Sequence, residues 1–171
     1  AGRGCLAGPV YAAAVILPRG LVIPGLDDSK KLTPRVRDSL YELIVQSAVS
    51  YGVASASEAE IDAVNILNAT YLAMNRAIAQ LDPLAELALI DGNRAGGTGY
   101  INRCIVGGDG KSASIAAASI LAKVSRDRYM TELAAEYPQY RFEQHKGYAT
   151  GLHYEMLRRH GPSVVHRRTF L

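Results

Sequence analysis

The stretch LAELALIDGN, residues 84–93, ends an apolar run in a carboxylate that is followed at once by glycine. Residues 85–91 are predicted to form a buried β-strand, because apolar side chains dominate them. An ionised carboxylate is costly to bury unless it is paired, hydrogen-bonded to backbone N–H groups or bound to a metal. A second predicted strand, INRCIVGG (101–108), is likewise followed by Asp109. The function of the protein therefore depends on which groups or ions bind the carboxylates of Asp91 and Asp109.

The rest of the chain alternates predicted strands with predicted helices. Apolar periodicity and turn residues indicate strands over 8–18, 51–57, 85–91 and 101–108, and helices over 32–49, between Ser57 and Pro83, over 112–137 and near 150–160. Thr33 and Pro34 are the expected first residues of one helix, and Ser57 with Glu60 forms a capping box for the next. Strands mixed with helices of this length predict an α/β domain, in which sites gather at the carboxyl ends of strands.

Composition places the chain among folded proteins of one domain. It has 171 residues, 49% of them hydrophobic and 20% charged, and no apolar run reaches the ~20 residues of a membrane helix. The N-terminal residues lack the basic and long apolar regions of a signal peptide. Cys5 and Cys104 are too few for a disulfide framework or a metal cluster. We expect reduced thiols, a cytoplasmic location, no membrane partner and a monomer.

Positive charge is concentrated in the last part of the chain, the basic helical segment 138–171. Residues 141–171 hold six Lys or Arg and two Glu, a net charge of +4, so residues 1–140 carry −1. A basic end on a near-neutral body suits a phosphate-rich partner. The alternative is an ordinary solvated basic helix and tail.

The two carboxylates are flanked by glycine, which allows sharp turns and close approach of a ligand. Two carboxylates brought together repel each other unless a cation lies between them. Oxygen ligands suit Mg²⁺ or Mn²⁺, and a pair of ions can clamp an in-line displacement at phosphorus. The alternative is that Asp91 and Asp109 are turn residues that cap helices, with Asp109 close to the helix start at Ser112.

Seven segments, in order, resemble bacterial ribonuclease HII, the type 2 ribonuclease H: AGRGCLAGPV, GLDDSKKLTP, EIDAVNILNAT, IDGNR, GGDGKSASIAAASILAKVSRDRYM, QHKGYAT and GPSVVHRRTF. The similarity runs from Ala1 to Phe170. It implies the ribonuclease H fold, a central mixed β-sheet flanked by helices with a C-terminal helical extension. It also implies cleavage of the RNA strand of RNA–DNA hybrids and nicking of duplex DNA 5′ of an embedded ribonucleotide, leaving a 3′-hydroxyl and a 5′-phosphate.

The resemblance assigns the catalytic residues. The family binds divalent metal with four acidic residues, and Asp91 and Asp109 match two of them. The other two are an adjacent Asp-Glu pair immediately before the Ala-Gly-Arg-Gly motif, which here begins at Ala1. We expect the chain to be a fragment of a longer protein; the alternative is a truncated, inactive form.

The resemblance also assigns the substrate contacts. Gly2, Arg3 and Gly4 match a motif whose backbone approaches the ribose 2′-hydroxyl. Tyr148 matches the tyrosine that packs on the next sugar at the RNA-to-DNA junction. Ser29, Lys30 and Lys31 match a loop that contacts phosphate.

Other polar residues receive structural interpretations. Asp127 lies between Arg126 and Arg128 and is expected to form an ion pair with them, and the four histidines are expected at the surface or beside phosphate. Two rival functions remain: a non-catalytic binder of RNA–DNA junctions, if the chain truly begins at Ala1, and a junction resolvase of the ribonuclease H superfamily.

Overall fold

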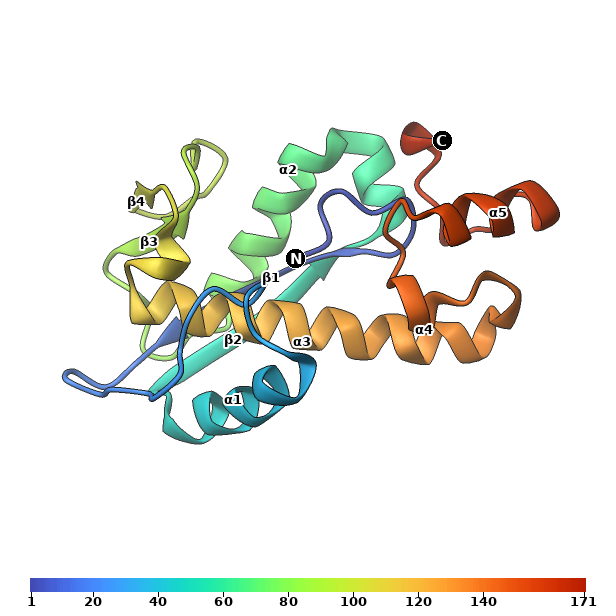
Figure 1. Cartoon of the computed structure of the whole chain (residues 1–171). Helices are drawn as coiled ribbons and strands as arrows, with labels where there is room; N and C mark the ends of the chain where they lie inside the picture. The colour runs from blue at the N-terminus through green and yellow to red at the C-terminus, as the bar shows by residue number, and fades with distance from the viewer.

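The computed structural model describes all residues, 1–171, as four strands, five α-helices and three short 3₁₀ turns (Figure 1). Along the chain the strands and helices are β1 (Val10–Ile16), α1 (Pro34–Ser47), β2 (Ser50–Ala56), α2 (Glu58–Ala79), β3 (Ala88–Asp91), β4 (Asn102–Ile105), α3 (Ala113–Glu136), α4 (Phe142–His145) and α5 (Gly151–His160). The predicted α/β class is confirmed, and each predicted element is present within a few residues of its expected bounds.

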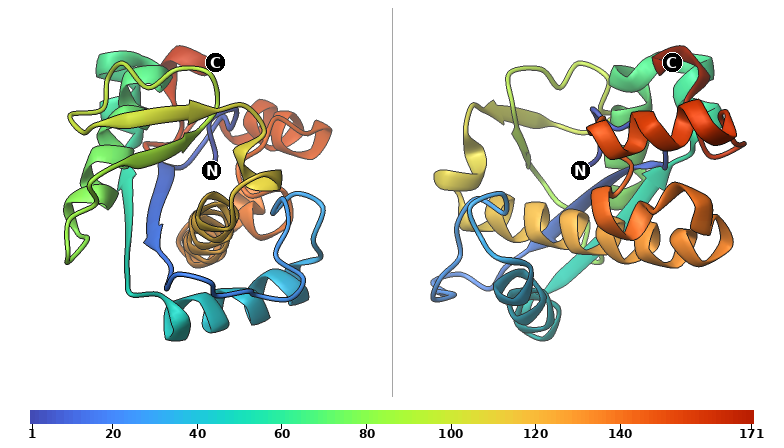
Figure 2. Two further views of the ribbon diagram at one scale, coloured as in Figure 1. Left: turned by 90° about the vertical axis from the view of Figure 1, so that its left-hand side faces the viewer. Right: turned by 45° about the vertical axis from the view of Figure 1, so that its right-hand side comes forward.

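The strands pair in both directions, as a mixed architecture requires. β1 pairs antiparallel with β2, from Val10 opposite Ala56 to Ile16 opposite Ser50, and β3 pairs parallel with β4. The two pairs form separate two-stranded sheets, which lie at an angle to each other in Figure 2. The other edge of β1 bonds only to Ala1, whose N–H and C=O groups pair with the backbone of Tyr11 at 2.6 and 3.0 Å.

Helix α3 is the central element of the fold. It lies along β1, and it also packs against α1, against α4 and against the turn that follows β4 (Figure 1). Small side chains allow this close packing: Ala116, Ala117 and Ala122 are all buried. The alanine-rich face in the first half of α3 therefore serves close packing.

The predicted helix starts are confirmed by their hydrogen bonds. The Thr33 side chain accepts from the N–H of Val36, Pro34 is the first residue of α1, and Ser57 and Glu60 form a reciprocal capping box. The single continuous helix expected after Ser57 is wrong in one respect. α2 is kinked at Asn65, whose backbone has φ 68° and ψ 165°, and the Asn65 side chain then accepts from the N–H of Asn68.

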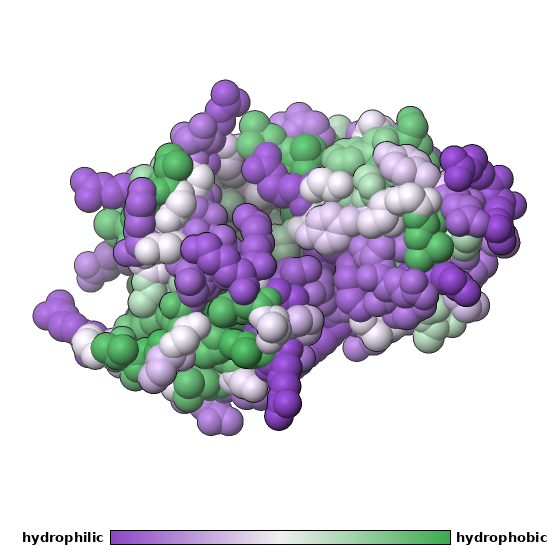
Figure 3. All heavy atoms as spheres, in the orientation of Figure 1, coloured by the Kyte–Doolittle hydropathy of each residue, from purple (hydrophilic) through white to green (hydrophobic).

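The C-terminal extension, α4 and α5, covers one end of α3. Figure 3 shows mostly hydrophilic residues over this end and a patch of apolar residues over the loop between β1 and α1, where Val22 is 81% exposed. No helix has both the length and the apolar character needed to cross a membrane. Both cysteines are free thiols, Cys5 being buried.

Candidate active site

The parallel pairing of β3 and β4 brings Asp91 next to the turn that carries Asp109. Asp91 lies opposite Ile105 in the register, and one Asp91 carboxylate oxygen accepts a 2.9 Å hydrogen bond from the N–H of Gly108. A Cβ at Gly108 would lie 2.6 Å from the Ile115 side chain and 3.4 Å from the Asp91 carboxylate, so glycine favours the close approach of this turn to Asp91. The two predicted metal ligands therefore lie at one edge of the sheet, as their positions after neighbouring strands imply.

The pKa of Asp109 depends on burial and on its acidic neighbours. Burial raises the pKa of Asp109, and the negative charges of Asp91 and Asp28 raise it further. The pKa of Asp28 is lowered, chiefly by the hydrogen bond from the N–H of Lys30 to its carboxylate. Asp28 was not among the predicted site residues, although it stands in the DDSKK segment immediately before the predicted phosphate contacts.

Helix capping does not account for Asp109. The side chain that caps α3 belongs to Ser112, whose hydroxyl accepts from the N–H of Ile115, and Asp109 lies one short turn earlier. Asp109 instead lines a cavity of about 290 Å³ between the Leu21–Leu26 loop and the start of α3. Asp109 thus lies at the wall of a cavity, beside the carboxylate of Asp28.

The predicted phosphate-contacting loop lies beside the carboxylates. Lys30 and Lys31 are exposed, whereas Ser29 is buried. The Arg37 guanidinium fixes the loop by donating to the carbonyl oxygens of Ser29 and Leu32 at 2.8 and 2.7 Å. Both lysines of the loop are thus exposed to solvent, while Arg37 fixes the loop backbone by hydrogen bonds.

Asp127 has different partners from those expected. Its carboxylate contacts Lys123 at 2.8 Å and Arg37 at 3.9 Å, and forms no ion pair with Arg126 or Arg128. Successive side chains on a helix point in different directions, while residues four apart share a face, so Lys123 is within reach and the two adjacent arginines are not. Asp127 thereby connects α3 to the arginine that holds the Ser29–Lys31 loop.

The remaining predicted substrate residues form a second group, which we call the N-terminal shelf: Gly2–Cys5 together with Gly147 and Tyr148. Cys5 and Tyr148 pair as an antiparallel bridge, and the N–H of Leu6 bonds to the carbonyl of Gly147. Tyr148 is 38% exposed, and its ring lies 5.5 Å from the Lys123 ammonium. α3 links the shelf to the carboxylates, because it starts just after Asp109 and its middle contacts Tyr148.

The histidines are placed differently from the prediction. His145, His153 and His166 are 7%, 0% and 1% exposed and lie together against Phe142, while only His160 is exposed. Each buried ring finds hydrogen-bond partners within the extension, which offsets its burial. They are core residues of the C-terminal extension.

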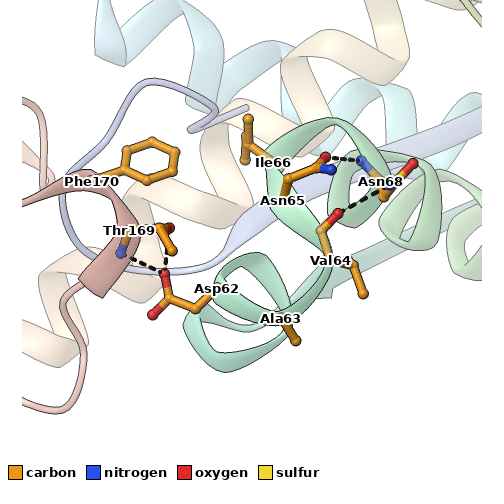
Figure 4. A pocket seen from close by; sticks show the side chains of 8 residues that line it. All are labelled: Asp62, Ala63, Val64, Asn65, Ile66, Asn68, Thr169 and Phe170. Atoms are coloured by element: carbon orange, nitrogen blue, oxygen red, sulfur yellow. Dashed lines mark hydrogen bonds between the residues drawn. The ribbon is translucent and has the colours of Figure 1, made fainter.

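A larger cavity, about 670 Å³, lies away from these residues at the kink of α2 (Figure 4). Its one carboxylate, Asp62, accepts hydrogen bonds from the backbone of Arg168 and Thr169 and from the Thr169 hydroxyl. Asp62 thus anchors the C-terminal residues, and this cavity offers no reactive group.

The donors of the carboxylate site fit a hard divalent cation. Asp91, Asp109 and Asp28 supply oxygen atoms only, and the repulsion that raises the pKa of Asp109 is what a cation between the carboxylates would relieve. No group of three or more His, Cys, Asp or Glu side chains converges closely enough to hold a metal ion alone. The three aspartates therefore have the chemistry of metal ligands but do not form a complete site by themselves.

Comparison with known proteins gives one consistent result. The family model of ribonuclease HII matches residues 1–171. The ribonuclease HII of Caldicellulosiruptor bescii is 52% identical over 171 residues, which are all of this chain and 83% of that protein, and that of Endomicrobium trichonymphae is 54% identical over 171 residues, covering 99% of this chain and 81% of that protein. The crystal structure of ribonuclease H2 from Pyrococcus horikoshii OT3 superimposes with a TM-score of 0.80 at 25% identity, covering 99% of this chain and 90% of that one. The chain belongs to the ribonuclease HII family, metal-dependent endonucleases that hydrolyse the RNA strand of RNA–DNA hybrids.

Proposed function

We propose that the chain also nicks duplex DNA on the 5′ side of a single embedded ribonucleotide, leaving a 3′-hydroxyl and a 5′-phosphate. Such an activity would serve ribonucleotide excision repair and primer removal. The observation that carries this proposal is the approach of two groups along α3: the carboxylates Asp91 and Asp109 at its start and the N-terminal shelf at its middle. The carboxylates can hydrolyse the phosphodiester bond while the N-terminal shelf recognises the ribose.

We propose that Asp91 and Asp109 are the catalytic carboxylates and hold Mg²⁺ or Mn²⁺, two ions being expected. When bound, the ions would activate a water molecule and stabilise the leaving 3′-oxygen. The Gly108 N–H holds one oxygen of Asp91, and so fixes the direction of its carboxylate. We expect substrate phosphate to complete the site, together with the Asp-Glu pair that the family carries before the Ala-Gly-Arg-Gly motif.

We propose that Gly2, Arg3 and Gly4 read the ribose 2′-hydroxyl. Arg3 and Gly4 are exposed, and their backbone N–H groups have no acceptor in the chain. Gly2 is needed for shape, because its φ is +85° and a Cβ there would lie 2.0 Å from the Arg126 side chain. Two adjacent free donors suit a hydroxyl oxygen that DNA lacks.

Tyr148 is proposed to pack on the neighbouring sugar, and the loop of Ser29, Lys30 and Lys31 to contact phosphate. The 38% exposure of Tyr148 and the exposure of both lysines support these roles. Phosphate contacts would fix the position of the duplex without reading its sequence.

We also propose one domain over residues 1–171, acting as a monomer in the cytoplasm. The contribution of α3 to two separate buried clusters supports a single domain, and the free thiols support a reducing compartment.

A cleavage assay with three substrates tests the proposal: a duplex with one embedded ribonucleotide, an RNA–DNA hybrid, and an all-DNA four-way junction, each in Mg²⁺ and in Mn²⁺. A second preparation carries an added N-terminal strand ending in Asp-Glu. We expect nicking 5′ of the ribonucleotide and cleavage of the hybrid, with end-labelling showing the 3′-hydroxyl. Binding of the first two substrates without cleavage by either preparation would favour the junction-binding module, and cleavage of the junction alone would favour a resolvase.

A further inference from the structure

Two arginines are completely enclosed beneath the N-terminal shelf. Arg126 on α3 is 1% exposed and Arg167, near the end of the chain, is 0% exposed. Neither forms an ion pair with a carboxylate; their seven hydrogen bonds all end on main-chain carbonyl oxygens. A buried charge without an opposite charge is an expensive way to stabilise a fold.

The acceptors of these hydrogen bonds belong almost wholly to the first nine residues. Arg126 donates to the carbonyls of Pro9 and Ala7 at 3.0 Å each, and to that of Lys146 at 2.8 Å. Lys146 directly precedes the Gly147–Tyr148 part of the shelf. Arg126 therefore joins the Ala7–Pro9 segment, which follows one half of the shelf, to Lys146, which precedes the other half. Its guanidinium also lies 5.7 Å from the centre of the Tyr148 ring.

Arg167 determines how the peptide groups of the shelf are turned. It donates to the carbonyl of Gly2 at 2.7 Å, to that of Arg3 at 2.9 Å, and twice to that of Gly8. In a trans peptide the N–H points opposite to the C=O. With the carbonyls of Gly2 and Arg3 turned toward Arg167, the N–H groups of Arg3 and Gly4 point away from it, and these are the two free donors of the shelf.

We propose that Arg126 and Arg167 are positioning residues for sugar discrimination: they hold the shelf so that the N–H groups of Arg3 and Gly4 face a bound strand at a fixed distance from Tyr148. This inference rests on the proposed role of the shelf in reading the 2′-hydroxyl. Lysine cannot replace either arginine, because one ammonium group cannot reach carbonyls that the planar guanidinium contacts from three nitrogens.

Binding constants for two duplexes that differ in a single 2′-hydroxyl provide the test. They are measured in EDTA, where a divalent-metal enzyme does not cut, for the wild type and for R126K and R167K. The matched controls are R128K, on the same helix with an exposed side chain, and R168K, the exposed neighbour of Arg167. We expect the preference for the ribonucleotide duplex to fall at least fivefold in R126K and R167K and to stay within twofold of wild type in both controls.

The outcomes separate this inference from the proposed function. A wild type without preference for the ribonucleotide duplex would refute the role of the shelf itself. A wild-type preference that R126K and R167K both retain, with circular dichroism showing them folded, would overturn the positioning role. Loss of affinity for both duplexes in equal measure would also overturn it, since a purely structural arginine would act that way.

Amide NMR of the wild type gives an answer even if neither lysine variant folds. The Arg3 and Gly4 amides should exchange rapidly with solvent in the free protein, unlike those of Leu6 and Gly8, which are hydrogen-bonded. They should shift on binding the ribonucleotide duplex and much less on binding its all-DNA counterpart. Equal shifts with both duplexes, or slow exchange in the free protein, would contradict the orientation that Arg167 is proposed to impose.

Discussion

Acidification should destabilise the protein through the buried histidines of the C-terminal extension. His153 donates from Nδ1 to the Tyr148 carbonyl at 2.9 Å, so in its neutral form Nε2 is an acceptor. The Nδ1 of His166 accepts from the N–H of Ser163 at 3.0 Å, so its Nε2 carries the hydrogen and donates to His153 at 3.1 Å. Every polar atom of the pair is satisfied only while both rings are neutral.

The size of the effect follows from the pKa of His166. Burial, followed by the charges of His153 and Arg168, lowers this pKa from 6.5 to about 4. Between pH 6.5 and 4, His166 is protonated in the unfolded chain but stays neutral in the folded chain. The stability is therefore complete above pH 6.5 and is lost as the pH falls, by ~3 kcal/mol over the whole window and about 2 kcal/mol at pH 5. The pKa values of His145 and His153 are lowered in the same direction, by burial first, and add to the loss.

Urea unfolding at pH 7.5, 6 and 5 measures this loss for the wild type and for H166Q. The control is H160Q, which changes the one exposed histidine. H166Q should be less stable at pH 7.5 and should lose about 2 kcal/mol less than wild type on going to pH 5, whereas H160Q should follow wild type. A free energy difference between wild type and H166Q that is the same at all three pH values would refute the reasoning.

Three further predictions concern the helices and the substrate contacts. S57A removes half of the capping box and should lower the free energy of unfolding by about 1 kcal/mol in urea, with hybrid cleavage unchanged at 25 °C; a loss below about 0.2 kcal/mol would mean that the cap is not formed. D127N weakens the hold of Arg37 on the Ser29 carbonyl, and steady-state kinetics should show KM raised about 3–10-fold with kcat within twofold, whereas a fall in kcat alone would contradict a role in binding. K31A should weaken binding of the ribonucleotide and all-DNA duplexes equally and reduce the slope of log Kd against log salt by about 1; an unchanged slope would remove Lys31 from the phosphate contacts.

Local sequence rules were sufficient to predict the helices and strands, and to predict that Asp91 and Asp109 lie at the same edge of a sheet. Caps such as Thr33 and Ser57 act within four residues, and parallel strands end at the same edge of a sheet. Asp28 could not be placed in this way. It reaches Asp109 across 81 positions of chain, through a loop whose path depends on the hold of Arg37.

The buried charges were the hardest features to predict. In the sequence, Arg126 and Arg167 look like ordinary surface arginines, and all but one of their acceptors are main-chain carbonyls more than 100 residues away, which any sequence could supply. The burial of the histidines was equally hard to predict, because their hydrogen-bond partners come together only in the folded extension. The kink at Asn65 could not be predicted either, because the residues around it have an ordinary helical pattern.

Single-turnover nicking of a duplex with one embedded ribonucleotide, by wild type, D91N and D109N, tests the central claim most directly. Each substitution keeps the size of the side chain and an acceptor oxygen, and Kd is measured alongside in EDTA. We predict a loss of at least about 100-fold in the nicking rate for both variants, corresponding to ~3 kcal/mol of transition-state stabilisation, with Kd within threefold of wild type. A variant that binds normally and retains the wild-type rate within threefold would show that its carboxylate does not carry the hydrolysis.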